Sequence, residues 1–185
     1  MKPFHKLILL LSVALLLAMP AACSRLAADD PPDDGRLRVV TTTAQVGDIA
    51  KNVGGEHVVV TSLMGPGTDP HLYKASARDV DKLRGADIVF YSGLFLEAQM
   101  EDVLEQMSER QTVAAVSAGI DRAELLPSAK YADEFDPHIW FDVGLWMQAT
   151  EQVRDTYMAA DPANAAGYEA NAAAYLAELA ALDAY

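Results

Sequence analysis

The stretch LRVVTTTAQVGDIAKNVGGEHVVVTSLM, residues 37–64, contains two β-branched apolar runs separated by a segment with helical periodicity. The runs LRVVTTT and HVVVTSLM are nearly continuous in apolar and β-branched residues, which is typical of strands covered on both faces. Between them, apolar side chains recur at helical spacing from Val46 to Val53, and Gly54-Gly55 mark the end of the helix. This order predicts a βαβ unit with parallel strands.

The same alternation continues beyond residue 64. The predicted elements are a helix over 75–86, a strand over 87–93, a helix over 96–110 and a strand over 112–119. We therefore expect an α/β fold with a parallel four-stranded sheet flanked by helices. Ligands of such sheets bind beyond the carboxyl ends of the strands. The loop at residues 65–73, GPGTDPHLY, follows the second predicted strand and is expected at that edge.

The last part of the chain is predicted to be helical. Residues 143–160 have the pattern of an amphipathic helix. Asp161 and Pro162 suit the start of another helix, as a capping residue and a first-turn proline. The alanine-rich sequence that follows reaches Tyr185 without a stop signal. We therefore expect a long C-terminal helix that continues further in the parent architecture.

The N-terminus has the pattern of an export signal. Residues 1–22 combine a basic start, an apolar run and a small-residue exit, and the run is too short to span a bilayer. Cys23, the one cysteine, stands at the exit, and its setting resembles a bacterial lipobox, although Pro20 replaces the usual aliphatic residue. We expect Cys23 to carry a lipid that anchors the protein to the membrane. Residues 23–36 are acidic and proline-bearing and are predicted to be a flexible tether.

The formal net charge of −13 disfavours nucleic acid as a partner, because phosphates would be repelled. It suits a protein that is exported to the periplasm or the cell surface. We expect the protein to be a monomer.

Two of the four histidines occur in matching contexts, GTDPHLY and FDPHIWFD. His71 and His138 each follow Asp-Pro and each precede an apolar and an aromatic residue. Proline restricts the backbone, so each imidazole is presented from a stiff stem, as a metal ligand must be. Asp69 and Asp136 could then accept a hydrogen bond from the second ring nitrogen, or cap the helix that follows. Each histidine could instead be a packed loop residue, but the repetition favours a metal site.

The remaining candidates are weaker. His57 opens a predicted strand and is expected at the surface, and His5 lies in the signal. Glu97 and Asp142 are single acids at element ends, and we expect them to cap helices rather than to bind a metal. Two histidines alone do not complete a zinc or manganese site, which needs four or more ligands.

The segment from the first histidine motif to residue 100, together with DPHIWFDVGLW, resembles the metal-binding receptors of bacterial zinc/manganese ABC importers. In that family a long helix joins two α/β lobes, and the metal lies between them. The resemblance implies that His71 and His138 are the two ligands of the N-terminal lobe. It also implies residues 37–160 as this lobe, residues 161–185 as the start of the joining helix, and a C-terminal lobe that the sequence lacks.

The resemblance implies capture of Mn²⁺ or Zn²⁺ as a transported ligand and its delivery to an ABC transporter permease. The sequence lacks the His-rich loop that is frequent in zinc-specific members, which favours manganese or mixed specificity. Phe95 stands where some members have histidine and cannot be a ligand. We expect no enzymatic activity. The alternatives are a metal-dependent hydrolase, for which no His-Glu-x-x-His or Gly-x-Ser-x-Gly motif is present, and a metal-supported surface adhesin.

Overall fold

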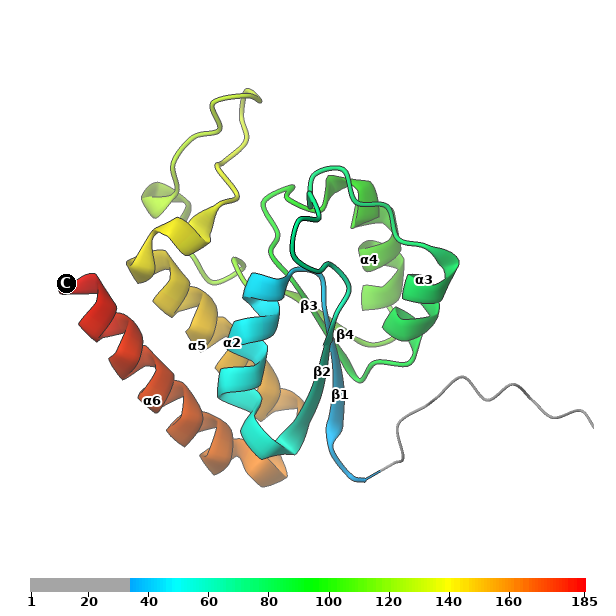
Figure 1. The fold of residues 1–185 in the computed structure, drawn as a ribbon, viewed down its shortest axis with the longest axis vertical. Coiled ribbons are helices and arrows are strands. Elements are labelled where there is room, and N and C mark those ends of the chain that lie inside the picture. Colours follow the sequence, from blue (N-terminus) through cyan, green and yellow to red (C-terminus); the bar gives the residue numbers. More distant parts are fainter. Residues whose placement is uncertain (1–33) are drawn as a thin grey trace, which may run out of the picture. The chain divides into compact units, whose positions relative to one another are not determined.

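Four parallel strands form the sheet in the computed structural model, which describes residues 34–185. They are β1 (Leu37–Thr41), β2 (Val58–Ser62), β3 (Ile88–Tyr91) and β4 (Thr112–Ala115). They pair in the order β2-β1-β3-β4, with β1 and β3 in the centre (Figure 1). The predicted four-stranded parallel sheet is therefore confirmed. The predicted signal peptide and Cys23 lie outside the described residues.

Helices cover both faces of the sheet (Figure 1). One face carries α2 (Ala44–Gly54), α5 (Val143–Ala160) and α6 (Ala165–Asp183); the other carries α3 (Ala77–Arg84) and α4 (Glu101–Ser108). Short 3₁₀ turns are η1 (Gly55–His57), η2 (Ala98–Met100), η3 (Arg122–Glu124), η4 (Ile139–Phe141) and η5 (Pro162–Asn164). Over residues 34–185, no helix combines the length and the apolar character needed to cross a bilayer.

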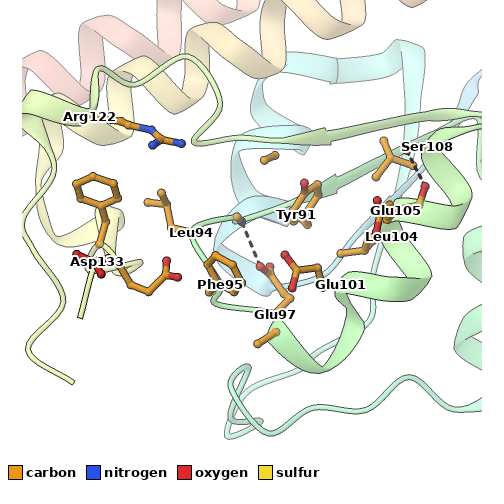
Figure 2. Close-up of a pocket in the computed structure, with 16 residues that line it drawn as sticks. Tyr91, Leu94, Phe95, Glu97, Glu101, Leu104, Glu105, Ser108, Arg122 and Asp133 are labelled. Carbon is orange, nitrogen blue, oxygen red and sulfur yellow. Dashed lines mark hydrogen bonds between the residues drawn. The ribbon is translucent and has the colours of Figure 1, made fainter. Parts of the chain in front are cut away.

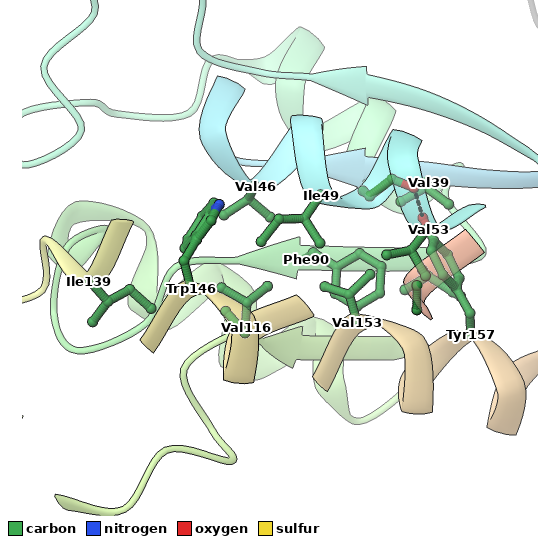
Figure 3. Packing of buried hydrophobic residues seen from close by; sticks show 14 of the residues in the cluster. Val39, Val46, Ile49, Val53, Phe90, Val116, Ile139, Trp146, Val153 and Tyr157 are labelled. Carbon is green, nitrogen blue, oxygen red and sulfur yellow. Dashed lines mark hydrogen bonds between the residues drawn. The ribbon is translucent and has the colours of Figure 1, made fainter. Parts of the chain in front are cut away.

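The alternation of side chains along the central strands creates two cores. Val39 and Phe90 point into the larger core under α2, α5 and α6, whereas their neighbours Val40 and Val89 point into the smaller core under α3 and α4. All four side chains are at most 5% exposed. Figure 3 shows Phe90 of β3 enclosed between apolar residues of α2 and α5. Burial on both faces explains why the strands read as continuous apolar runs.

Two stacked tyrosines fix α5 and α6 to the rest of the lobe. The rings of Tyr157 and Tyr168 stack with centroids 5.0 Å apart, and Phe90 meets Tyr157 edge-on at 5.2 Å. The Tyr157 hydroxyl donates a hydrogen bond of 3.0 Å to the carbonyl of Ala50 in α2. Burial raises the pKa of Tyr157, so its hydroxyl stays a neutral donor.

Two predicted helix starts differ from the structure. The helix expected over 96–110 begins only at Glu101, because the preceding residues Ala98–Met100 form the 3₁₀ turn η2 instead. Asp161 was expected to cap a backbone N–H, but its carboxylate accepts hydrogen bonds from the side chains of Asn164 and Tyr168 instead. Pro162 does occupy the first turn, as predicted.

Candidate metal site

A hollow of about 310 Å³ opens at the carboxyl edge of the sheet. Its walls are the first residues of α2, the loop at residues 64–71 that follows β2, and two residues that precede α5, His138 and Trp140. Thr43 caps α2 by accepting the Val46 N–H, which fixes the wall that α2 contributes. Strand β2 leads the first Asp-Pro-His segment to this edge, where the fold class predicts a ligand, and the second segment reaches it just before α5.

His71 and His138 meet in this hollow. Their Nε2 atoms lie 3.3 Å apart, and the ring centroids are separated by 5.3 Å at an interplanar angle of 62°. His71 is exposed and His138 is partly buried, so solvent reaches the pair. The sequence prediction that the two motifs converge is therefore correct in its geometry, and both imidazoles direct the same nitrogen toward the same point.

Asp136 orients the ring of His138. Its Oδ1 lies 2.6 Å from His138 Nδ1 and also accepts the His138 backbone N–H at 3.0 Å. The backbone and ring hydrogen bonds of His138 lower the pKa of Asp136, so the group is an ionised acceptor at neutral pH. An ionised carboxylate can only accept, so Nδ1 is the donor in this contact; when the ring is neutral, Nε2 presents a lone pair.

Asp69 has a different role from Asp136. Its Oδ1 accepts the backbone N–H of His71 at 2.9 Å, and its carbonyl accepts the N–H of Leu72 at 3.3 Å. The structure contains no hydrogen bond between Asp69 and the His71 ring among the described residues. The interpretation of Asp69 as a ring partner is thus wrong in this structure: Asp69 stabilises the turn that carries the histidine.

A buried carboxylate anchors the far side of the His71 loop. The Tyr73 hydroxyl donates to Asp79 Oδ2 at 2.8 Å, and the same oxygen accepts from the Ser76 hydroxyl at 2.6 Å. Ser76 and Asp79 form a capping box at the start of α3. Burial, followed by the hydrogen bond to Asp79, raises the pKa of Tyr73 to about 12. Sequence reasoning missed this anchor, although Ser-x-x-Asp before a helical pattern is its signal.

Aromatic and apolar residues surround the pair. The Trp140 ring meets the His138 ring edge-on at 5.2 Å, which restricts its rotation. Leu72, next to His71, and Phe141, three residues after His138, are 74% and 81% exposed, so an exposed apolar side chain follows each histidine. The aromatic residues two positions after the histidines therefore differ in role. Tyr73 anchors the loop that carries His71, whereas Trp140 packs against the ring of His138.

The other acidic candidates do not join the pair. Asp142 caps α5 by accepting the Leu145 N–H, as predicted. Glu97 was expected to cap a helix, but its buried carboxylate accepts from the Thr42 hydroxyl and from the N–H groups that follow β3.

His57 was expected at the surface but is half-buried against a tyrosine ring. Within the described chain, no group of three or more His, Cys, Asp or Glu could hold a metal ion.

Comparison with known proteins assigns the family. A model described as "Zinc-uptake complex component A periplasmic" (ZnuA) matches residues 39–185. The chain belongs to this family. The family predicted from the two histidine motifs is thus confirmed.

Individual relatives also carry metal-binding names. The chain is 47% identical over 150 residues to the manganese-binding lipoprotein MntA of Bacillus subtilis, covering 81% of this chain and 49% of the relative. It is 40% identical over 156 residues to the zinc-binding protein TroA of Treponema pallidum, covering 84% and 50%. The chain therefore spans about half the length of these relatives.

Solved structures give the same result. The periplasmic zinc-binding protein TroA from Treponema pallidum superposes with a TM-score of 0.78 at 40% identity, covering 82% of this chain and 54% of TroA. Zn(II)-bound AdcA from Streptococcus pneumoniae superposes with a TM-score of 0.73 at 33% identity, covering 80% and 32%. The predicted fold class is therefore shared with these metal-binding proteins.

Proposed function

We propose that the chain is the metal-capturing N-terminal lobe of an extracytoplasmic substrate-binding protein that delivers Mn²⁺ or Zn²⁺ to an ABC permease. The observation that carries the proposal is the separation of 3.3 Å between His71 Nε2 and His138 Nε2. Two nitrogens bound to one zinc ion at about 2.0–2.1 Å, with a tetrahedral angle between them, lie about 3.3 Å apart. The pair is therefore spaced to bind one ion with little rearrangement.

The tautomer supports the same assignment. Because Asp136 holds the proton of His138 on Nδ1, the lone pair of Nε2 is available to a metal when the ring is neutral. Without a metal, the Nε2 of His71 can donate its proton to this lone pair across the 3.3 Å. Metal binding then only requires His71 to carry its proton on Nδ1.

Two imidazoles fill half of a tetrahedral site, so tight binding requires further ligands. We propose that these come from a second lobe that faces the exposed apolar side chains of Leu72 and Phe141. A nitrogen ligand from that lobe suits zinc, whereas carboxylates suit manganese. The relatives named as a manganese-binding lipoprotein and a zinc-binding protein are consistent with either ion.

Placement at the membrane belongs to the same proposal. The relative MntA is named a lipoprotein, and Cys23 directly follows the predicted signal peptide. We propose that lipidated Cys23 anchors a monomeric protein outside the membrane, close to its permease. Replacing Cys23 with serine should release the protein from the membrane fraction, and retention there would contradict this part.

The test is metal affinity measured by isothermal titration calorimetry with ZnCl₂ and MnCl₂. His71→Ala and His138→Ala should each weaken binding at least about tenfold, because each removes one metal–nitrogen bond. His57→Gln is the matched control, since His57 packs against Tyr168 in another part of the lobe. Unchanged affinity in both alanine variants would refute the site.

The hydrolase alternative needs a general base aimed at a metal-bound water. Asp136 does not serve, because its Oδ1 already accepts both the ring and backbone N–H groups of His138. Capture rather than catalysis is therefore the function that the geometry supports, and no observation favours the adhesin alternative.

A further inference from the structure

A second and larger hollow lies on the other side of the sheet from α2. Its volume is about 670 Å³, and it opens between α4, strand β4 and the segment at residues 133–135. Figure 2 shows Glu101 and Glu105 of α4 on one side of this groove and Arg122 on the other. We call it the β4 groove. It shares no lining residue with the hollow that contains the two histidines.

The floor of the β4 groove is apolar. Tyr91, Leu104 and Val113 extend the core beneath α4 to the surface, and Phe135 closes the opposite wall. Burial, followed by the negative charges of neighbouring glutamates, raises the pKa of Tyr91. The floor is therefore apolar, with the carboxylates of Glu97 and Glu101 beside it.

A strained turn presents Phe95 at the mouth of the groove. Leu94 and Phe95 have φ of 53° and 61°, which costs on the order of 1 kcal/mol or more for each residue. Glu97 holds this turn, since its carboxylate accepts the N–H groups of Ser92 and Gly93 at 2.8 and 3.1 Å. Phe95 remains 52% exposed, so the turn places an apolar ring where an occupant would cover it.

The rim of the β4 groove is acidic. Glu101, Glu105, Asp133 and Glu134 line it, and the ion pairs formed within residues 34–185 include none of them. The one basic residue of the lining, Arg122, lies 5.9 Å from the ring of Phe135. Four carboxylates against one guanidinium favour an occupant with positive charge.

Strand β4 supplies backbone groups beside this rim. It pairs with β3 on one side and forms the edge of the sheet on the other. On the outer edge of Thr112–Ala115, the Ala115 carbonyl accepts the N–H of Ala118 at 3.1 Å; the backbone groups of Val113 have no hydrogen-bond partner on that side among the described residues. Such an edge can accept a further strand through main-chain hydrogen bonds, while side chains of that strand fill adjoining pockets.

We infer that the β4 groove binds an extended, positively charged segment of a partner protein, which adds as a fifth strand beside β4. Its apolar side chains would contact Tyr91 and Phe95, and its basic side chains would pair with Glu101 and Glu105. The open shape of the groove and the unbonded backbone groups of Val113 at the strand edge favour an extended segment over a small enclosed cation. The β4 groove and the metal site share no lining residue.

The probe is a fluorescein-labelled octapeptide of alternating lysine and valine, and binding is followed by fluorescence anisotropy. A glutamate–valine peptide is the charge control, and a lysine–valine peptide with N-methylated backbone amides is the strand-pairing control. The protein variant is E101Q/E105Q. Its matched control is E178Q/D183N, which removes the same charge from exposed positions of α6.

The lysine peptide should bind, E101Q/E105Q should weaken it at least about threefold, and N-methylation should weaken it at least about tenfold. The glutamate peptide should not bind, and E178Q/D183N should change affinity less than twofold. Zinc affinity should be the same in all variants, which keeps this test independent of the metal site. Equal weakening by both double variants would reduce the effect to net charge and overturn the inference. Undiminished binding of the N-methylated peptide, or of spermidine at equal affinity, would overturn strand addition.

Discussion

Replacing Asp79 with asparagine should destabilise the lobe in a pH-dependent way. Burial acts to raise the pKa of Asp79, but hydrogen bonds from Ser76 and Tyr73, with Lys82 at 3.2 Å, outweigh it. The pKa is thereby held at about 2, against an ordinary value of 3.8. The Asp79 side chain is 11% exposed, so these contacts are only weakly screened.

The size of the Asp79 contribution to stability follows from the linkage between proton binding and folding. At about 1.4 kcal/mol for each tenfold change in proton affinity, a fall from 3.8 to about 2 corresponds to about 2.5 kcal/mol. We expect about 2 kcal/mol, because the Lys82 contribution is partly screened. The folded-state pKa is depressed, so the full stabilisation is present above the unfolded-state pKa. It is lost as the pH falls from about 4 through about 2.

Urea unfolding of wild type and Asp79→Asn between pH 2 and pH 6 measures this contribution. The free energies of unfolding should differ by about 2 kcal/mol at pH 6 and converge near pH 2. Asp81→Asn is the control on the same helix, because the Asp81 side chain is 76% exposed and its ion pair with Arg84 is long, at 3.8 Å. The Asp79 assignment would be refuted if the difference in free energy of unfolding between wild type and Asp79→Asn did not change with pH. It would also be refuted if Asp81→Asn showed the same pH-dependent difference from wild type.

Three further substitutions have defined outcomes. Tyr157→Phe removes the hydroxyl that donates a second hydrogen bond to the Ala50 carbonyl of α2 and should cost about 0.5–1.5 kcal/mol in the free energy of unfolding, measured by urea titration. Gly47→Ala places a Cβ in steric conflict with Ser62 Oγ and should cost about 1–3 kcal/mol in the free energy of unfolding. Ser62→Ala in the same chain should recover part of this loss, and the absence of any recovery would contradict the steric cause. Asp136→Asn should weaken zinc binding about 10- to 100-fold by calorimetry with little effect on the melting temperature.

The sheet could be predicted because its strands are buried on both faces. Residues 37–64 must then be apolar in unbroken runs, and the helix between them shows its period through the residues that face Phe90 and Tyr157. The position of His71 at the carboxyl edge followed from the same fold class, since its loop comes directly after the second strand. The pairing with His138 was indicated only by the repeated Asp-Pro-His motif and the family resemblance.

The roles of Glu97, Asp69 and the turn after β3 could not be predicted, because they depend on the folded arrangement of the chain. Nothing local to Glu97 shows that its carboxylate will bind the Thr42 hydroxyl, 55 residues away, rather than cap a helix. Leu94 and Phe95 adopt positive φ although their side chains disfavour it, so tertiary contacts override local preference there. Asp69 and Asp136 precede the two histidines identically, and only the folded loops distinguish a turn acceptor from a ring acceptor.

The central claim is that His71 and His138 bind one metal ion together through Nε2. Long-range ¹H–¹⁵N NMR spectra of the histidine rings, recorded during a zinc titration, test it most directly. We predict that the Nε2 signals of both rings shift together at the same zinc concentration, while those of His57 stay unchanged. A shift of one ring alone, a shift at Nδ1, or an equal response of His57 would contradict the account.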